Sequence, residues 1–158
     1  MNFEIKIKWS DLRQQIDLRN FYMGESAKRN DINADTMQSS NDDEKLLLMF
    51  TQRACNELIT TVAVRFPSIT SNADTENITI TFESETTPPQ HLLTMLKQAI
   101  SDYIVNDVNM HWLLTVKPEM AQTNISLRSV LYSNVQMMFA KIYNRQKLRR
   151  RSTNLAGI

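Results

Sequence analysis

Residues that break the backbone are scarce in this sequence. Only two of its 158 residues are glycine and only four are proline. Because these two residue types form most tight turns and end most helices, their scarcity favours long helices over a β-fold with many turns. We therefore expect a mainly α-helical chain, and 158 residues are enough for one domain with a hydrophobic core.

Two segments depart from this helical character. Residues 3–9 and 77–83 alternate apolar and polar side chains, as half-buried β-strands do. Two strands alone are marginally stable, so their apolar face is covered either by the chain's helices or by a second copy. The second alternative makes five side chains candidate oligomer contacts: Ile5, Ile7, Ile78, Ile80 and Phe82.

The spacing of apolar residues elsewhere predicts four helices. They are expected from about Asp11 to Gly24, from about Asn41 to Arg65, after Pro88 and Pro89 as far as Lys117, and from about Glu119 to Arg151. The last two form an antiparallel hairpin across Lys117 and Pro118. Its expected core joins Leu96, Ile100, Tyr103, Ile104 and Val108 to Leu131, Val135, Met138, Phe139 and Ile142.

Two further segments lack an apolar stripe. Residues 25–43 are polar and are expected to be a mobile arm that becomes ordered only against a partner. Residues 147–158 are expected to form an extended basic tail, in which the end of the last helix is followed by a non-helical stretch from Ser152 to Ile158. The fold class is thus mainly α with a small β component, a helical bundle or hairpin plus two short strands in a single domain over residues 1–158.

Charge is distributed unevenly along the chain. Residues 120–158 hold seven basic and no acidic side chains, whereas residues 1–119 hold 11 basic and 17 acidic ones, a net charge of −6. A solvated helix end explains part of this, because cations stabilise a helix C-terminus. Five cations within residues 145–151 exceed that need and indicate an anionic partner, either nucleic acid or an acidic protein surface. The candidate contact residues are Arg145, Lys147, Arg149, Arg150, Arg151, Leu155 and Ile158.

The sequence carries no pattern typical of catalysis. Its glycines, Gly24 and Gly157, cannot form a phosphate-binding loop, and no cysteine and histidine spacing suits zinc. His91 and His111 lie about 30 Å apart along one expected helix, and Cys55 lies in an apolar helical run typical of a structural cysteine. No apolar run reaches 18 residues, so no membrane span is expected. We expect no enzymatic activity, cofactor, metal or membrane.

The C-terminal hairpin, residues 91–151, resembles a family of small connector proteins encoded beside the head and tail genes of tailed bacteriophages, especially phages of Bacteroidetes. The matching residues are Asp102-Tyr103-Ile104-Val105, Trp112-Leu113, Lys117-Pro118-Glu119 and Lys147-Leu148-Arg149-Arg150-Arg151. The resemblance implies a non-enzymatic virion protein assembled in the host cytoplasm. It would form a ring, usually of twelve copies, in the neck between portal and tail, around the channel for packaged DNA.

Two other functions fit the residues alone. The basic end suits a nucleic-acid-binding accessory protein, although no helix-turn-helix or zinc-finger pattern indicates sequence-specific reading. A helical adaptor in a bacterial complex is the other alternative. A ring-forming or particle-associated protein favours the connector, and a monomer that binds DNA tightly favours the accessory protein.

Overall fold

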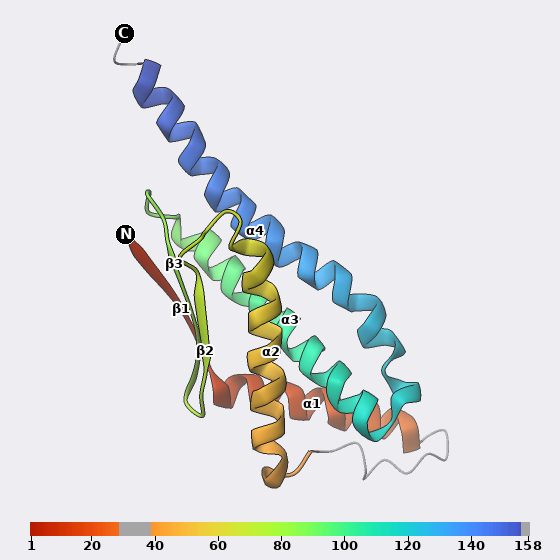
Figure 1. Ribbon diagram of the computed structural model, residues 1–158. Helices are drawn as coiled ribbons and strands as arrows, with labels where there is room; N and C mark the ends of the chain where they lie inside the picture. The colour runs from red at the N-terminus through yellow and green to blue at the C-terminus, as the bar shows by residue number, and fades with distance from the viewer. Residues whose placement is uncertain (29–38, 156–158) are drawn as a thin grey trace.

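The computed structural model describes residues 1–28 and 39–155, a mainly α-helical fold with a small sheet (Figure 1). This confirms the predicted fold class. The elements, in chain order, are β1 (Asn2–Lys8), α1 (Trp9–Lys28), a 3-10 turn (Asn41–Asp43), α2 (Glu44–Val62), β2 (Thr70–Ala73), β3 (Asn77–Glu83), α3 (Gln90–Val116), a second 3-10 turn (Pro118–Met120) and α4 (Gln122–Leu155).

The sheet is antiparallel, in the order β1-β3-β2. The two predicted strands pair along their whole length, with Ile5 opposite Ile80 and Ile7 opposite Ile78. The third strand, β2, was not predicted because Thr70-Ser71-Asn72-Ala73 has no apolar alternation. It pairs with β3 at one edge of the sheet, where a polar strand needs no buried face.

The apolar face of the sheet is covered by the chain's own helices. Helix α3 contacts β1, and Phe139 of α4 lies against Phe82 of β3 with the ring centroids 5.5 Å apart. The prediction of contacts to another copy through this face is therefore wrong, since these side chains fill the core of the chain itself. The five are at most 5% exposed: Ile5, Ile7, Ile78, Ile80 and Phe82.

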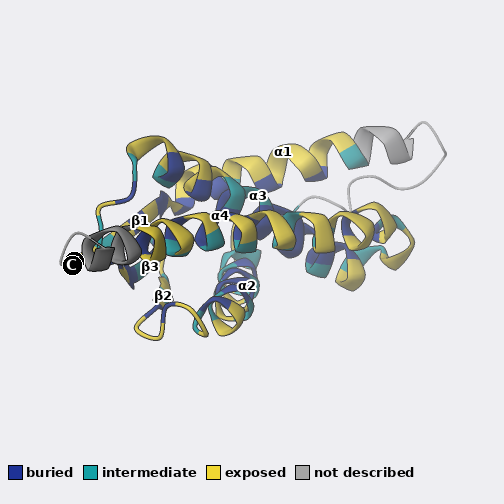
Figure 2. Ribbon diagram, turned by 90° about the horizontal axis from the view of Figure 1, so that it is seen from above, coloured by how far each residue is buried: buried dark blue, intermediate teal, exposed yellow. Residues whose placement is uncertain are grey.

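Helix α3 is the centre of the molecule. It contacts α1, α2, α4 and β1, and every residue from position 103 to 110 is buried. Figure 2 shows α1 and α2 on either side of it. A helix covered on all sides must bury whatever polar residues it carries, and α3 buries Asn106, Asp107 and Asn109.

Several predicted boundaries shift. Helix α1 starts at Trp9, whose backbone N–H donates to the carbonyl of Glu76 at 2.9 Å, and it continues past Gly24 to Lys28. Helix α2 ends at Val62, three residues before the predicted end. Of the predicted mobile arm, residues 25–28 belong to α1 and residues 41–43 to a 3-10 turn, while residues 29–38 lie outside the described residues.

The predicted extended tail is helical instead. Helix α4 continues to Leu155, and residues 156–158, including Ile158, lie outside the described residues. Glutamine, lysine, leucine and arginine, which make up residues 146–151, are good helix formers, and no glycine or proline occurs between Pro118 and Gly157. An apolar stripe is not needed for a helix to continue once it has been nucleated.

The predicted core of the α3–α4 hairpin is confirmed, with one difference. Nine of its ten residues are buried, whereas Leu131 is only partly buried at its edge. Ile125 and Leu127, which precede this core on α4, are 44% and 42% exposed. The buried stripe of α4 therefore centres on Val135, Phe139 and Ile142.

Two valines of α4 test this placement. Val135 is 0% exposed and Val130 is 55% exposed. We expect Val135→Asp to destabilise the fold by several kcal/mol, because it buries an unpaired carboxylate. Val130→Asp should change stability by less than about 0.5 kcal/mol. Thermal unfolding followed by circular dichroism measures both, and equal melting temperatures would contradict the orientation of α4.

Candidate partner-binding site

The C-terminal end of α4 extends past the sheet and the other helices (Figure 1). It is held as far as Gln146, which is buried and donates from Nε2 to Oγ of Ser84 at 2.5 Å. One turn earlier, Tyr143 packs against Phe66 with the ring centroids 6.0 Å apart. The last turns of α4 thus project from a firmly anchored helix.

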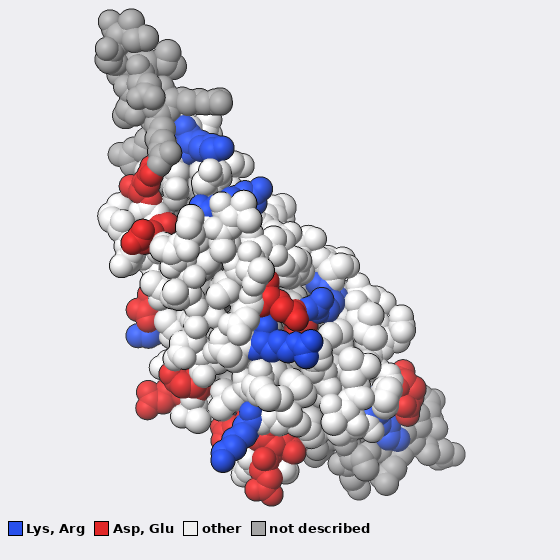
Figure 3. Space-filling model, viewed as in Figure 1, with Lys and Arg blue, Asp and Glu red and all other residues white. Residues whose placement is uncertain are grey.

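Basic and apolar side chains share this projecting end. Arg145 and Lys147 are exposed, and Leu148 is 65% exposed. The Lys147 ammonium lies 4.9 Å from the centroid of the Tyr143 ring, a cation–π distance. Positive charge at the visible base of this end appears in Figure 3.

The structure brings most of the predicted contact residues onto this one helical end. Arg149, Arg150 and Arg151 lie in the last turns of α4, and Leu155 is its final residue. Since these turns extend an anchored helix, their cations are carried on a preformed element. The projecting end is defined here as residues 145–155.

Arg128, the seventh basic residue of the acid-free segment, serves another purpose. Its Nε donates to Oδ1 of Asp107 at 2.7 Å, and its terminal nitrogen donates to Oη of Tyr103 at 3.2 Å and to Glu57. The hydrogen bond to Asp107 raises the pKa of Arg128. This guanidinium therefore ties α4 to α2 and α3 and does not belong to the binding surface.

The Tyr103 hydroxyl, which lies beside this ion pair, stays protonated. Burial, followed by the charge of Asp107, raises the pKa of the Tyr103 hydroxyl, which donates to Glu57 at 3.3 Å. His111 stacks on Phe50 at a ring-centroid distance of 5.4 Å, and its Nε2 is 3.5 Å from Oδ2 of Asp107. His111 thus packs within the fold.

Sequence reasoning missed this network, although its signal was present. Asp107 occupies a position at apolar spacing on α3, and Arg128 does the same on α4. A carboxylate at a core position requires a cation or donors around it. Asking which cation could reach Asp107 would have identified Arg128.

The described residues contain neither a group of side chains placed to bind a metal ion nor a membrane-spanning helix. Among residues 1–28 and 39–155, no group of three or more histidine, cysteine, aspartate or glutamate side chains is placed to hold a metal ion. Within the same ranges no helix is long and apolar enough to cross a membrane.

Comparisons with known proteins add no family. The chain matches no protein-family model, no curated protein and no solved structure.

The ion pair between Asp107 and Arg128 generates a stability prediction. Replacing Arg128 with methionine leaves a fully buried carboxylate without its cation, at an expected cost of roughly 2–3 kcal/mol. The cost falls below that of a fully buried pair because the Arg128 side chain is 36% exposed. The double variant Asp107→Leu/Arg128→Met should recover most of this loss. Urea unfolding measures both, and a double variant no more stable than the single one would contradict the pairing.

Cys55 generates a reactivity prediction. Burial, with a smaller contribution from the charge of Asp107, raises the pKa of its thiol to about 12. At pH 8 only about one thiol in 10⁴ is then ionised, and the side chain is 0% exposed. We expect an aromatic disulfide reagent to label native Cys55 only as fast as the protein unfolds. Immediate labelling, as in urea, would show an accessible thiol.

Proposed function

We propose that this protein is a non-enzymatic structural subunit that binds its neighbours through the projecting end of α4. Following the resemblance of its C-terminal hairpin, we propose that the assembly is the head-to-tail connector of a tailed bacteriophage. The subunits would then form a ring, of about twelve copies by that resemblance, between portal and tail in the virion neck.

One observation carries the proposal: an anchored helix extends past its own domain and carries a concentrated positive charge. Gln146 fixes α4 to Ser84, and three consecutive arginines follow in its last turns. A helix that only completed the hairpin could end where its buried stripe ends, at Ile142 to Gln146. The additional turns contain no described core residue, so we infer that their role is to bind a partner.

A second candidate function rests on the same charge. Arginine forms bidentate hydrogen bonds with phosphate as readily as with carboxylate, so the projecting end also suits DNA. In a connector the two partners are compatible, because the ring surrounds the path of the packaged DNA. They differ in salt dependence, since contacts to several phosphates weaken steeply as salt rises.

Removing the projecting end tests the proposal. Deleting residues 147–158 should leave helix content and melting temperature nearly unchanged, since the deletion removes no described core residue. It should abolish incorporation into purified particles, measured by quantitative mass spectrometry after complementation. As a matched control, Lys97→Ser/Lys141→Ser removes two exposed cations elsewhere and should incorporate normally.

Two outcomes would contradict this function. Normal incorporation of the truncated chain would leave the projecting end as a solvated helix terminus. Loss of DNA binding alone, with a log–log salt slope near −0.9 per phosphate and intact incorporation, would favour the accessory protein.

A further inference from the structure

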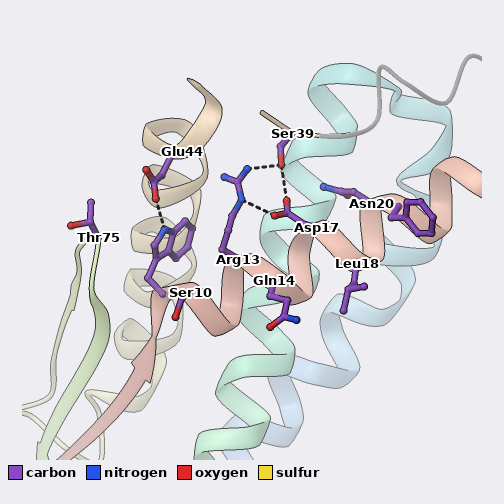
Figure 4. A pocket seen from close by; sticks show the side chains of 11 residues that line it. Ser10, Arg13, Gln14, Asp17, Leu18, Asn20, Ser39, Glu44 and Thr75 are labelled. Atoms are coloured by element: carbon purple, nitrogen blue, oxygen red, sulfur yellow. Dashed lines mark hydrogen bonds and ion pairs between the residues drawn. The ribbon is translucent and has the colours of Figure 1, made fainter. Parts of the chain in front are cut away.

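A hollow of about 800 Å³ lies beside the first turns of α1 (Figure 4). Its walls come from α1, from the start of α2 and from the turn between β2 and β3. In Figure 1 these elements lie at the end of the molecule away from the projecting end of α4. The lining side chains are Trp9, Ser10, Arg13, Gln14, Asp17, Leu18, Asn20, Phe21, Ser39, Glu44 and Thr75.

Hydrogen bonds fix the walls of this hollow. Nε1 of Trp9 donates to Glu44 at 2.9 Å, which joins the start of α1 to the start of α2. Arg13 contacts Asp17 at 3.1 Å and donates to the carbonyl of Ser40 at 3.0 Å. The arginine charge is thus neutralised within the wall, and Glu44 contributes a carboxylate.

Asn20 indicates that a polar ligand group belongs in the hollow. It is 0% exposed, and among the described residues neither atom of its side-chain amide has a hydrogen-bond partner. In Figure 4 its nitrogen extends toward the side where Asp17 and Ser39 lie. A buried amide without partners destabilises a fold, and a polar group bound in the hollow would satisfy the Asn20 amide.

Apolar side chains lie beside this amide. On the same helix, Leu18 is 47% exposed and Phe21 is 45% exposed, and both line the hollow. The hollow therefore suits a partner that presents apolar and polar groups together, and its volume is that of a substantial binding pocket.

The surroundings of the hollow carry more acidic than basic side chains. Within two positions of a lining residue in the sequence, the exposed cations are Lys8, Arg19 and Lys45, and the exposed acids are Asp11, Asp42, Asp74 and Glu76. They are part of the net charge of −6 carried by residues 1–119. A cationic partner is favoured at such a rim.

We propose that the hollow receives the projecting end of α4 from a second copy of this chain. That end has the complementary chemistry, since Leu148 is exposed among cations in a segment without acidic residues. The hollow and the projecting end lie at opposite ends of the molecule (Figure 1), so the contact joins two copies head to tail. Repeating such a contact closes a ring or extends a filament. The inference rests on the proposed function and specifies the neighbour that the projecting end binds.

Charge reversal in the full chain tests this contact. One variant carries Arg149→Glu, Arg150→Glu and Arg151→Glu, and a second carries Asp11→Lys, Asp42→Lys and Glu76→Lys. Sedimentation velocity should show self-association weakened about tenfold or more in each. The chain carrying all six substitutions restores opposite charges and should recover self-association to near the wild-type level. Circular dichroism checks that every variant is folded.

Two single substitutions test the apolar part. Leu18→Ser should weaken self-association, whereas Leu127→Ser, at a similarly exposed leucine of α4, should not. Asn20→Ala should raise the melting temperature of the dilute monomer and weaken self-association, as expected of a group kept for binding at a cost in stability.

The outcomes separate this inference from the proposed function. If the arginine variant fails to enter particles while the acid-reversed variant assembles like wild type, the inference is wrong and the proposed function stands. If the arginine variant assembles normally, the proposed function fails as well. A wild-type chain that stays monomeric at all concentrations, or a six-substitution chain that does not recover, also overturns the inference.

Discussion

The buried contact between Asp107 and Arg128 holds the two long helices in register, and the rest of the molecule depends on it. The Asp107 carboxylate has no solvent exposure, and the guanidinium 2.7 Å away reaches it from α4 while also contacting Glu57 on α2. A slip of α4 by one turn would leave the carboxylate uncompensated, which is strongly unfavourable. Asn106, next to Asp107, and Asn124, one turn before Arg128, exchange side-chain-to-backbone hydrogen bonds at 3.0 and 3.4 Å and favour the same register.

This register determines how far α4 extends. When Arg128 is paired with Asp107, Val135 and Phe139 are buried in the core. Gln146 is then placed to donate its hydrogen bond to Ser84, which follows strand β3. The remaining turns have no further part of the sheet beneath them and project (Figure 1). One helix therefore carries both the arginine that is neutralised in the body, Arg128, and the three consecutive arginines of the projecting end. The same geometry keeps the projecting end away from the hollow beside α1, so that their contact requires two copies.

The sequence predicts the parts of this fold that local patterns determine. Alternation located β1 and β3, and three- and four-residue spacing located α3, α4 and their core. The edge strand β2 was missed because its residues, Thr70 to Ala73, carry no apolar alternation. Ile5 and its neighbours were assigned to a contact between copies because a pattern shows an apolar face but not what covers it. For the candidate site, the composition located the cations. That they lie on a projecting helix could not be predicted, because it depends on the hydrogen bond that anchors Gln146 to Ser84. The hollow could not be predicted from the sequence, because its lining residues come from α1, α2 and a turn that are distant in the chain.

Cross-linking between differently labelled copies tests the central claim, that the projecting end of α4 binds a neighbouring copy, most directly. A photoreactive residue at Leu148, which is exposed on that end, would be activated in an equal mixture of ¹⁴N- and ¹⁵N-labelled chains. The account predicts mass-spectrometric peptide pairs of mixed label that join position 148 to the segment from Trp9 to Phe21. The account would be contradicted if no mixed-label pairs formed, or if the mixed-label pairs joined position 148 to any other surface.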